Sequence, residues 1–243
     1  MPGAFAGRIA LVTGASRGLG RAAALALAEA GAHVVAVART VGGLEELDDA
    51  IRACGGAATL VPLDLADGAG IDKLGAAIFQ RWGRVDAFLC NAGQLGVITP
   101  LAHLDVKVWD EVIAVNLTAC WRLIRSLDPL LRQSDAGRAL FLTSGAARNC
   151  RPFWGAYSVS KAGLEALVRT YAAEIARTKA RANLIDPGPM RTAMRAKAMP
   201  GEDPQTLPEP KAMLPKILEL LSPGFEENGV LYDVRRQEVR PFA

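Results

Sequence analysis

Short apolar runs alternate along the chain with longer segments in which apolar residues recur at helical spacing. Runs of apolar and β-branched residues predict strands at 8–13, 33–38, 59–65, 85–90, 138–143 and 182–185. Ala- and Leu-rich segments between them predict helices at 18–30, 44–53, 71–82, 106–131 and 157–178. A further short strand is expected within 229–233. Strands without polar alternation are typical of a parallel sheet that helices cover on both faces.

This alternation predicts an α/β fold, a doubly wound parallel sheet of about seven strands joined by right-handed crossovers. The pattern never restarts as a separate unit, and no linker, repeat or low-complexity tract precedes residue 187. We therefore expect residues 1–243 to form a single domain.

The composition changes between residues 187 and 215, which hold seven of the 14 prolines and four of the 5 methionines. Proline prevents long regular helices, and methionine supplies apolar surface that adapts to irregular shapes. Open α/β sheets bind ligands at the carboxyl ends of their strands, where this stretch begins. We interpret residues 189–215 as a substrate lid. The alternative is a loosely structured surface insertion.

The overall composition is globular, with 51% apolar and 22% charged residues, and it excludes intrinsic disorder. A net charge of +3 gives no reason to expect a nucleic acid or a membrane as partner. The two histidines and four scattered cysteines, without a CxxC pair, predict no metal site. Those cysteines are expected to be buried thiols of a cytoplasmic protein, and no signal segment is recognised at Met1.

A glycine-rich turn at residues 13–20 joins the first predicted strand to the first predicted helix. Glycines permit close approach of an anion to the backbone, and the helix directs free N–H groups at a phosphate. The GxxxGxG spacing meets the general dinucleotide fingerprint only approximately, so a purely structural turn is the alternative. Residues 14–18 also match the GxSxG of hydrolases, but His103 lies in a linker, unsuited to complete a triad.

Tyr157 and Lys161 are four residues apart on one predicted helix, so their side chains share a face. A phenol is a poor acid or base at neutral pH, and a neighbouring ammonium favours its deprotonated form. The pair is a weak signal alone, because an ordinary amphipathic helix surface gives the same spacing.

Together these motifs resemble the short-chain dehydrogenase/reductase family, in order from about residue 7 to residue 192, in agreement with a Rossmann-type fold. The matching positions are Thr13, Gly14, Gly18 and Gly20, Asp64-Leu65, Asn91-Ala92-Gly93, Asn116, Ser144, Tyr157 with Lys161, Pro187-Gly188 and Thr192. The resemblance implies hydride transfer between a nicotinamide cofactor and a carbonyl or alcohol.

By this resemblance, Tyr157 exchanges a proton with the substrate oxygen, and Lys161 binds the cofactor ribose and assists Tyr157. Ser144 would hydrogen-bond the carbonyl oxygen, and Asn116 would hold a water that links Lys161 to solvent. A strand-end cap at Ser144 and a locally satisfied polar group at Asn116 are the alternatives. The residues expected to contact the cofactor are Gly14, Ser16, Arg17, Gly18, Leu19, Gly20, Arg39, Asp64, Leu65, Asn91, Ala92, Gly93, Tyr157, Lys161, Pro187, Gly188 and Thr192.

Charge at the end of the second predicted strand indicates which cofactor is preferred. Enzymes that prefer NAD place an acid there to bind the ribose 2′-hydroxyl, but this chain has Arg39. Arg39 and Arg17 can clamp a 2′-phosphate, which suits a forked guanidinium. We predict NADP(H), with NAD(H) possible and reduction as the expected direction. Two solvated surface arginines are the alternative.

The substrate is less well defined. Trp154 is expected to wall the pocket and, with the lid, favours a small apolar or aromatic carbonyl. Arg148 or Arg151 could bind an acidic substrate tail or face solvent. Cys150 is expected to be a buried, inert thiol, and a modifiable thiol beside the site is the alternative. The alternative function is a non-catalytic NADP-binding sensor or scaffold.

The resemblance weakens after Thr192. A basic segment at 234–238 stands where many family members have a Gly-Gly end at a subunit interface. A homodimer through the two long helices, or a homotetramer, is nevertheless expected.

Overall fold

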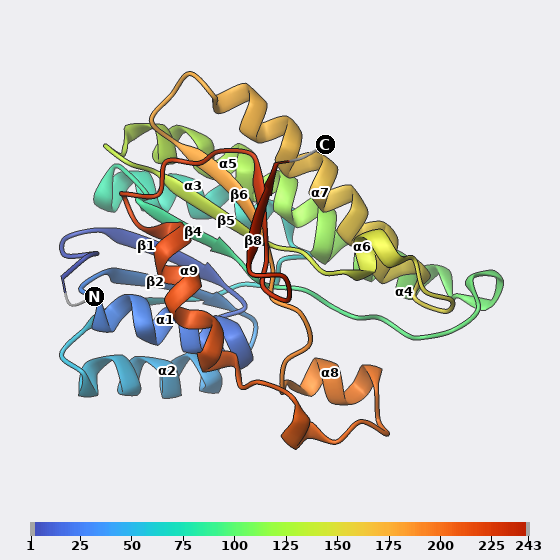
Figure 1. The fold of residues 1–243 in the computed structure, drawn as a ribbon. Coiled ribbons are helices and arrows are strands. Elements are labelled where there is room, and N and C mark those ends of the chain that lie inside the picture. The colour runs from blue at the N-terminus through green and yellow to red at the C-terminus, as the bar shows by residue number, and fades with distance from the viewer. Residues whose placement is uncertain (1–2, 242–243) are drawn as a thin grey trace.

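A computed structural model of the protein describes residues 3–241 and contains one eight-stranded sheet in the order β3-β2-β1-β4-β5-β6-β7-β8 (Figure 1). Every neighbouring pair is parallel except β7 and β8. The strands are β1 Ile9–Thr13, β2 His33–Ala38, β3 Ala57–Pro62, β4 Ala87–Cys90, β5 Arg138–Leu142, β6 Arg181–Asp186, β7 Val230–Asp233 and β8 Glu238–Pro241. The predicted doubly wound parallel sheet is confirmed, with β8 added at its edge.

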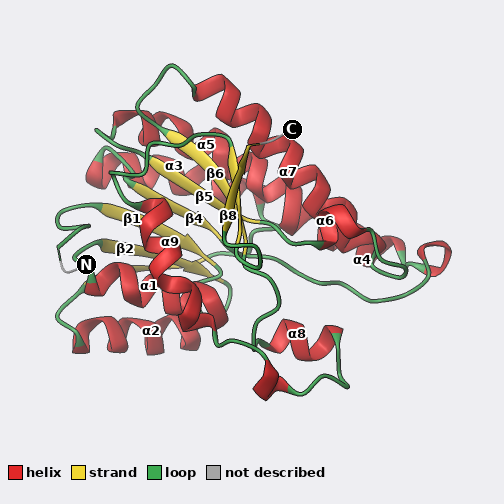
Figure 2. Cartoon of the chain, in the orientation of Figure 1, coloured by secondary structure: helices red, strands yellow, loops and turns green. Residues whose placement is uncertain are grey.

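Helices pack on both faces of this sheet (Figure 2). They are α1 Gly18–Glu29, α2 Val41–Ala53, α3 Gly68–Trp82, α4 Val106–Ile113, α5 Ala119–Gln133, α6 Ala146–Asn149, α7 Gly155–Ile175, α8 Ala193–Ala198 and α9 Leu214–Leu221. Apolar side chains of α3, α5 and α7 fill the core on one face, and those of α1, α2 and α9 fill it on the other. All side chains of β1, β4 and β5 are buried, which explains their uninterrupted apolar sequences.

Three predicted elements differ in detail from the structure. The third strand was expected at 59–65 but ends at Pro62, because its partner β2 ends at Ala38. The predicted helix at 106–131 is divided by a π-helical turn, Ala114–Thr118. Such turns are rare insertions within α-helices, and the predicted continuous helix did not anticipate this one. The basic segment after β7 turns back and forms β8.

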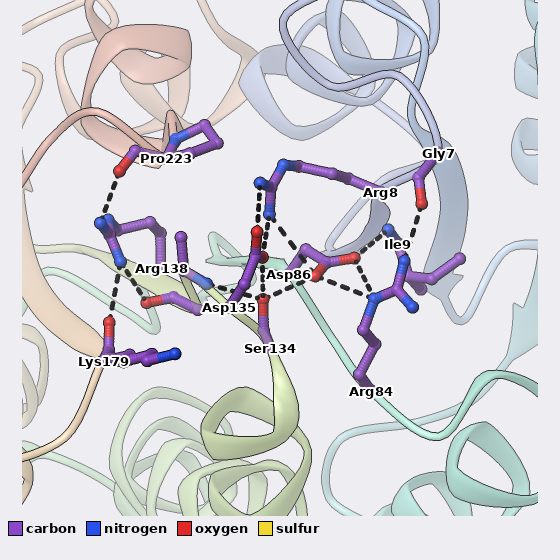
Figure 3. Close-up of polar contacts among 12 residues, drawn as sticks. Gly7, Arg8, Ile9, Arg84, Asp86, Ser134, Asp135, Arg138, Lys179 and Pro223 are labelled. Atoms are coloured by element: carbon purple, nitrogen blue, oxygen red, sulfur yellow. Dashed lines mark hydrogen bonds and ion pairs between the residues drawn. The ribbon is translucent and has the colours of Figure 1, made fainter.

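Charged side chains form a network around the buried Asp86 carboxylate at the amino ends of the central strands (Figure 3). The carboxylate of Asp86, 2% exposed, accepts hydrogen bonds from the Ile9 amide at 2.8 Å and the Ser134 hydroxyl at 2.6 Å. Arg84 pairs with the same carboxylate at 3.1 Å. The network therefore joins the starts of β1 and β4 to the segment that enters β5, at the edge opposite the loops that follow the strands.

The cysteine prediction is correct for only two of the four side chains. Cys90 and Cys120 are buried, with their sulfurs 3.4 Å apart, whereas Cys54 and Cys150 are exposed. The expectation that Cys150 is a buried thiol is therefore wrong. It occupies a left-handed turn that ends α6, with φ of 43°, and this turn directs the residue outward. Within residues 3–241, no helix is long and apolar enough to cross a membrane.

Candidate active site

The loops that follow β1, β2, β3, β4, β5 and β6 surround one cavity of about 1050 Å³. Nearly every residue expected from the sequence lines it. These residues are Gly14, Ser16, Arg17, Gly18, Leu19, Arg39, Asp64, Leu65, Asn91, Ala92, Gly93, Ser144, Tyr157, Lys161, Pro187, Gly188 and Thr192. Gly20 and Asn116 do not line the cavity but contact residues that do.

The glycine loop forms an open cradle at the start of α1. Gly14 and Gly18 have positive φ angles of 67° and 57°, which glycine adopts without strain. A Cβ on Gly20 would overlap the carbonyl oxygen of Gly14 and the side-chain nitrogen of Asn91, whereas the Cβ direction of Gly18 is open. Among residues 3–241, no side chain caps the first turn of α1. Its free N–H groups therefore suit a phosphate, and the loop fits a dinucleotide.

Thr13 and Asn91 fasten the end of β1 to the end of β4. The Thr13 hydroxyl accepts hydrogen bonds from the amides of Asn91 at 3.0 Å and Ala92 at 3.1 Å. The Asn91 side chain donates to the Thr13 carbonyl at 2.9 Å. Because its amide nitrogen is used in this way, Asn91 supports the floor of the cavity mainly by fixing backbone.

Two arginines lie at the end of the cavity formed by the loops after β1 and β2. Arg39 pairs with Asp64 at 3.7 Å, and both side chains are about half exposed. No ion pair or hydrogen bond of the Arg17 side chain occurs within residues 3–241. Both cations therefore remain able to meet an added anion, although Arg39 must share its charge with Asp64.

Tyr157 and Lys161 lie one turn apart on α7. The Lys161 ammonium is 5.9 Å from the centre of the Tyr157 ring and donates to the Leu142 carbonyl at 2.8 Å. Lys161 is only 4% exposed, so its charge is held in a fixed place. Trp154 packs edge-on against the Tyr157 ring at 6.0 Å and lines the cavity, as expected.

Ser144 follows β5 and faces the same cavity. Its hydroxyl oxygen accepts a hydrogen bond from the Ala146 amide at 3.2 Å, which is the capping contact weighed as an alternative. Because that contact uses only a lone pair, the hydroxyl proton remains free to donate to a substrate oxygen.

Asn116 is fully buried in the π-helical turn between α4 and α5. Its side chain accepts from the Gln94 amide at 2.7 Å and donates to the Gln94 carbonyl at 2.8 Å and the Ser160 hydroxyl at 3.0 Å. A Cβ on Gly93 would lie 3.4 Å from the Asn116 side-chain oxygen and 3.7 Å from the Lys161 nitrogen. Asn116 therefore borders the lysine, but most of its bonding capacity fixes the Gln94 backbone.

Arg148 lines the cavity with its side chain 33% exposed, so it is partly solvated, which was one of its two expected roles. Its guanidinium pairs with Glu165 on α7 and with Asp186 at the end of β6. The Thr143 hydroxyl donates to the same Glu165 oxygen at 2.6 Å, and the Gly188 amide donates to Asp186 at 3.1 Å. Sequence reasoning missed Glu165 and Asp186. The one available signal was Glu165 lying four residues after Lys161, on the same helix face.

The lid segment and the carboxyl-terminal hairpin both reach the cavity. Met190 and Met194 line it, whereas Met213 is buried in the core beside α9. The segment is built from α8 and two short 3-10 turns, Pro204–Thr206 and Pro210–Met213. Arg235 and Arg236, from the basic segment after β7, also line the cavity. Within residues 3–241, no cluster of three His, Cys, Asp or Glu side chains is arranged to hold a metal.

A doubly wound sheet with a glycine cradle after β1 and a Tyr–Lys pair in the same cavity is the arrangement of a nicotinamide-dependent oxidoreductase. A sequence model of the short chain dehydrogenase family matches residues 8–203. The chain belongs to the short-chain dehydrogenase/reductase family, as the sequence motifs predicted.

Several relatives match over nearly the whole chain. The uncharacterized oxidoreductase YciK of Escherichia coli K12 is 37% identical over 232 residues, which cover 94% of this chain and 92% of YciK. A short chain dehydrogenase of Shigella flexneri, complexed with NADP, superimposes with a TM-score of 0.93 at 36% identity, covering 97% of this chain and 100% of that one. Another, from Escherichia coli CFT073 and complexed with NADPH, gives 0.89 at 37% identity, covering 95% and 98%.

Proposed function

We propose that the protein is an NADP(H)-dependent reductase of a small-molecule carbonyl compound, with Tyr157 as the acid and base. The observation that carries this proposal is that Tyr157, Lys161 and Ser144 border the same cavity as the glycine cradle. When bound, NADPH supplies a hydride to the carbonyl carbon, and the carbonyl oxygen takes up one proton to complete the alcohol.

The chain's own residues manage the oxygen and its proton. The Tyr157 hydroxyl donates its proton to the substrate oxygen, and the Ser144 hydroxyl donates a hydrogen bond that stabilises the charge building there. The buried Lys161 ammonium stabilises the tyrosinate that remains. Asn116, beside Lys161, is proposed to hold the water through which the proton is replaced.

Arg17 and Arg39 are proposed to bind the 2′-phosphate of NADP(H). In support, both line the cavity, Arg17 has no other partner within residues 3–241, and similar structures hold NADP or NADPH. The remaining members of the cofactor list keep the roles predicted from the sequence. NAD(H) remains a possible second cofactor with lower affinity, because Asp64 offers a carboxylate near Arg39.

The substrate is proposed to have an apolar or aromatic body. Trp154, Met190 and Met194 support this because they line the cavity. Residues 189–215 are proposed to act as a lid within a single domain. Assembly as a homodimer or homotetramer and a cytoplasmic location stay predictions from the sequence.

Nicotinamide absorbance tests this function directly. Purified protein is mixed with NADPH and a panel of ketones, quinones, aldehydes and 3-oxoacyl thioesters. We expect at least one class of compound to oxidise NADPH. This oxidation should be lost in Tyr157→Phe, which keeps the aromatic ring but lacks the hydroxyl proton. NADPH binding, measured by its fluorescence, should persist in that variant. Binding without turnover across the whole panel would instead favour the sensor or scaffold. Undiminished turnover by Tyr157→Phe would remove Tyr157 from its role.

A further inference from the structure

The basic segment after β7 is a built hairpin rather than a free tail. One carboxylate oxygen of Asp233 accepts hydrogen bonds from the amides of Arg235 at 3.1 Å and Arg236 at 3.4 Å. The Gln237 amide donates to the Val234 carbonyl at 3.3 Å, and β8 then pairs antiparallel with β7. These contacts fix the backbone from which the Arg235 side chain extends.

Arg235 lies against the loop that follows β6. A Cβ on Gly188 would be 3.1 Å from the Arg235 Cγ and 3.4 Å from its Nε. Gly188 belongs to the segment expected to face the nicotinamide, and Arg235 lines the cavity that also contains Ser144 and Tyr157. The absence of a side chain at Gly188 therefore leaves the space that the arginine stem occupies.

The charges around this part of the cavity are not balanced. Arg148 is paired with Glu165 and Asp186, and Arg195 is paired with Glu202 through two nitrogens. Arg235 has no carboxylate within ion-pair distance among residues 3–241, and neither does Lys197, which lines the same cavity. The bonds from Arg195 already lower the pKa of Glu202, with a weaker contribution from Arg235. Neither Arg235 nor Lys197 is therefore held in a direct ion pair by a described side chain, and both can bind an added anion.

We infer that Arg235, assisted by Lys197, binds a carboxylate of the carbonyl substrate. This inference rests on the proposed reductase function and specifies its substrate class as an anion with an apolar body. The forked guanidinium is suited to two parallel hydrogen bonds with such a group. The same fork could bind a phosphate of the cofactor, so the two sources must be separated.

The sheet order favours the substrate. The glycine cradle follows β1, and Arg235 follows β7, which is four strands away through β4, β5 and β6. With about 4.8 Å between neighbouring strands, the two sites are roughly 19 Å apart. Of the arginines proposed for the 2′-phosphate, Arg17 lies in that cradle and Arg39 follows β2, one strand farther from Arg235. The anion subsite therefore lies on the nicotinamide and substrate side of the cavity.

The test compares acids with their neutral esters, using the enzyme saturated with NADPH. The probes are 4-oxopentanoate, 5-oxohexanoate, 6-oxoheptanoate and benzoylformate, each beside its methyl ester, so that the distance from carbonyl to carboxylate varies. We expect wild type to have a higher kcat/KM for at least one acid than for its ester. In Arg235→Met, which keeps the stem against Gly188, that preference should fall about tenfold through a higher KM for the acid.

Two further variants control for charge and folding. Arg235→Lys keeps the positive charge without the fork, so it should recover part of the preference. Arg240→Met removes one positive charge from the same hairpin, at a residue that pairs with Glu238 and does not line the cavity. It should leave the ratio of acid to ester unchanged. A matching loss in Arg240→Met would attribute the preference to net charge and overturn the subsite.

The remaining outcomes are also decisive. Equal use of acids and esters by wild type overturns the subsite while leaving the reductase function intact. Weaker NADPH binding in Arg235→Met, with an unchanged ratio, assigns Arg235 to the cofactor instead. If no carbonyl compound is reduced, the proposed function fails. In that case the acids are titrated against the fluorescence of bound NADPH: a response lost in Arg235→Met supports the subsite, and no response in wild type overturns it.

Discussion

Arg148 on α6 binds the carboxylate of Asp186 at the end of β6. The same guanidinium binds Glu165 on α7. The Glu165 carboxylate also accepts a hydrogen bond from the Thr143 hydroxyl, which follows β5. These contacts join the segments that carry Ser144, the Tyr157–Lys161 pair and the Pro187-Gly188 loop. One arginine therefore sets the relative positions of the groups proposed to handle the substrate oxygen.

Replacing Arg148 with Met should lower both stability and activity. Two carboxylates, whose side chains are 16% and 9% exposed, would lose their shared counter-charge. Removing one partner of a largely buried pair leaves an uncompensated charge, so we expect a loss of about 1–3 kcal/mol in the free energy of unfolding. Misplacement of Ser144 should reduce kcat/KM by about tenfold. Urea unfolding and steady-state NADPH oxidation measure the two effects.

Conservative and second-site variants separate positioning from general damage. Arg148→Lys should recover part of both losses because it retains the charge. Asp186→Asn should lower the free energy of unfolding less in the Arg148→Met background than in wild type. Without Arg148, the change relieves repulsion between the Glu165 and Asp186 carboxylates, which the arginine neutralises in wild type. Strictly additive effects would show that the pair does not act as a unit.

The sequence was sufficient for the parallel sheet and for the residues gathered at its carboxyl edge. Buried strands leave an uninterrupted apolar pattern, and parallel strands bring the motifs that follow them to one edge. Arg148 could not be understood in this way. Its partners at 165 and 186 come from other elements, and nothing in its local sequence specifies them. The position of the Arg235 side chain in the cavity likewise depends on the hairpin after β7 and on Gly188, which is distant in the sequence.

Arg39→Asp should shift cofactor preference toward NADH. An aspartate there would repel the 2′-phosphate and could accept a hydrogen bond from the ribose hydroxyl. The ratio of kcat/KM for NADPH to that for NADH should fall about tenfold or more. Asp64→Asn provides the matched comparison: it releases Arg39 from its 3.7 Å ion pair and should raise the same ratio. An unchanged ratio in both variants would refute the assignment of Arg39.

Gly20→Ala tests the phosphate cradle without touching the catalytic groups. The added methyl would overlap the Gly14 carbonyl and the Asn91 side chain, so the loop must move. We expect NADPH affinity to fall at least about tenfold and stability to fall by about 1–3 kcal/mol. Gly42→Ala in α2 is the control, because its Cβ meets no atom within 4 Å. That change should raise helix stability slightly and leave affinity unaltered. Normal NADPH affinity in Gly20→Ala would mean that the loop is not the phosphate site.

His33 predicts loss of stability in acid. Burial first, and then the charge of Arg81, lower the pKa of this imidazole from 6.5. The unfolded chain therefore takes up a proton at a higher pH than the folded chain, so unfolding is favoured as pH falls below about 6.5. His33→Gln, which can still bond Thr59, should show a smaller decrease in the free energy of unfolding between pH 7.5 and 5.5. An equal decrease in both proteins would assign the acid sensitivity elsewhere.

Arg138, 5% exposed, lies at the amino end of β5 and has no carboxylate within ion-pair distance among residues 3–241 (Figure 3). It donates to four backbone carbonyls, those of Gly137, Lys179, Pro223 and Phe225. Burial, and then the charges of Arg181 and Arg8, lower its pKa. Arg138→Met would leave those carbonyls unsatisfied, so we expect a loss of about 2–4 kcal/mol in urea unfolding. Because this end of the strand is remote from the cavity, kcat and KM of the folded fraction should not change. Lys211→Met, which removes an exposed pair with Glu209, should cost under about 0.5 kcal/mol. Equal stability of the two variants would mean that the carbonyls find other donors.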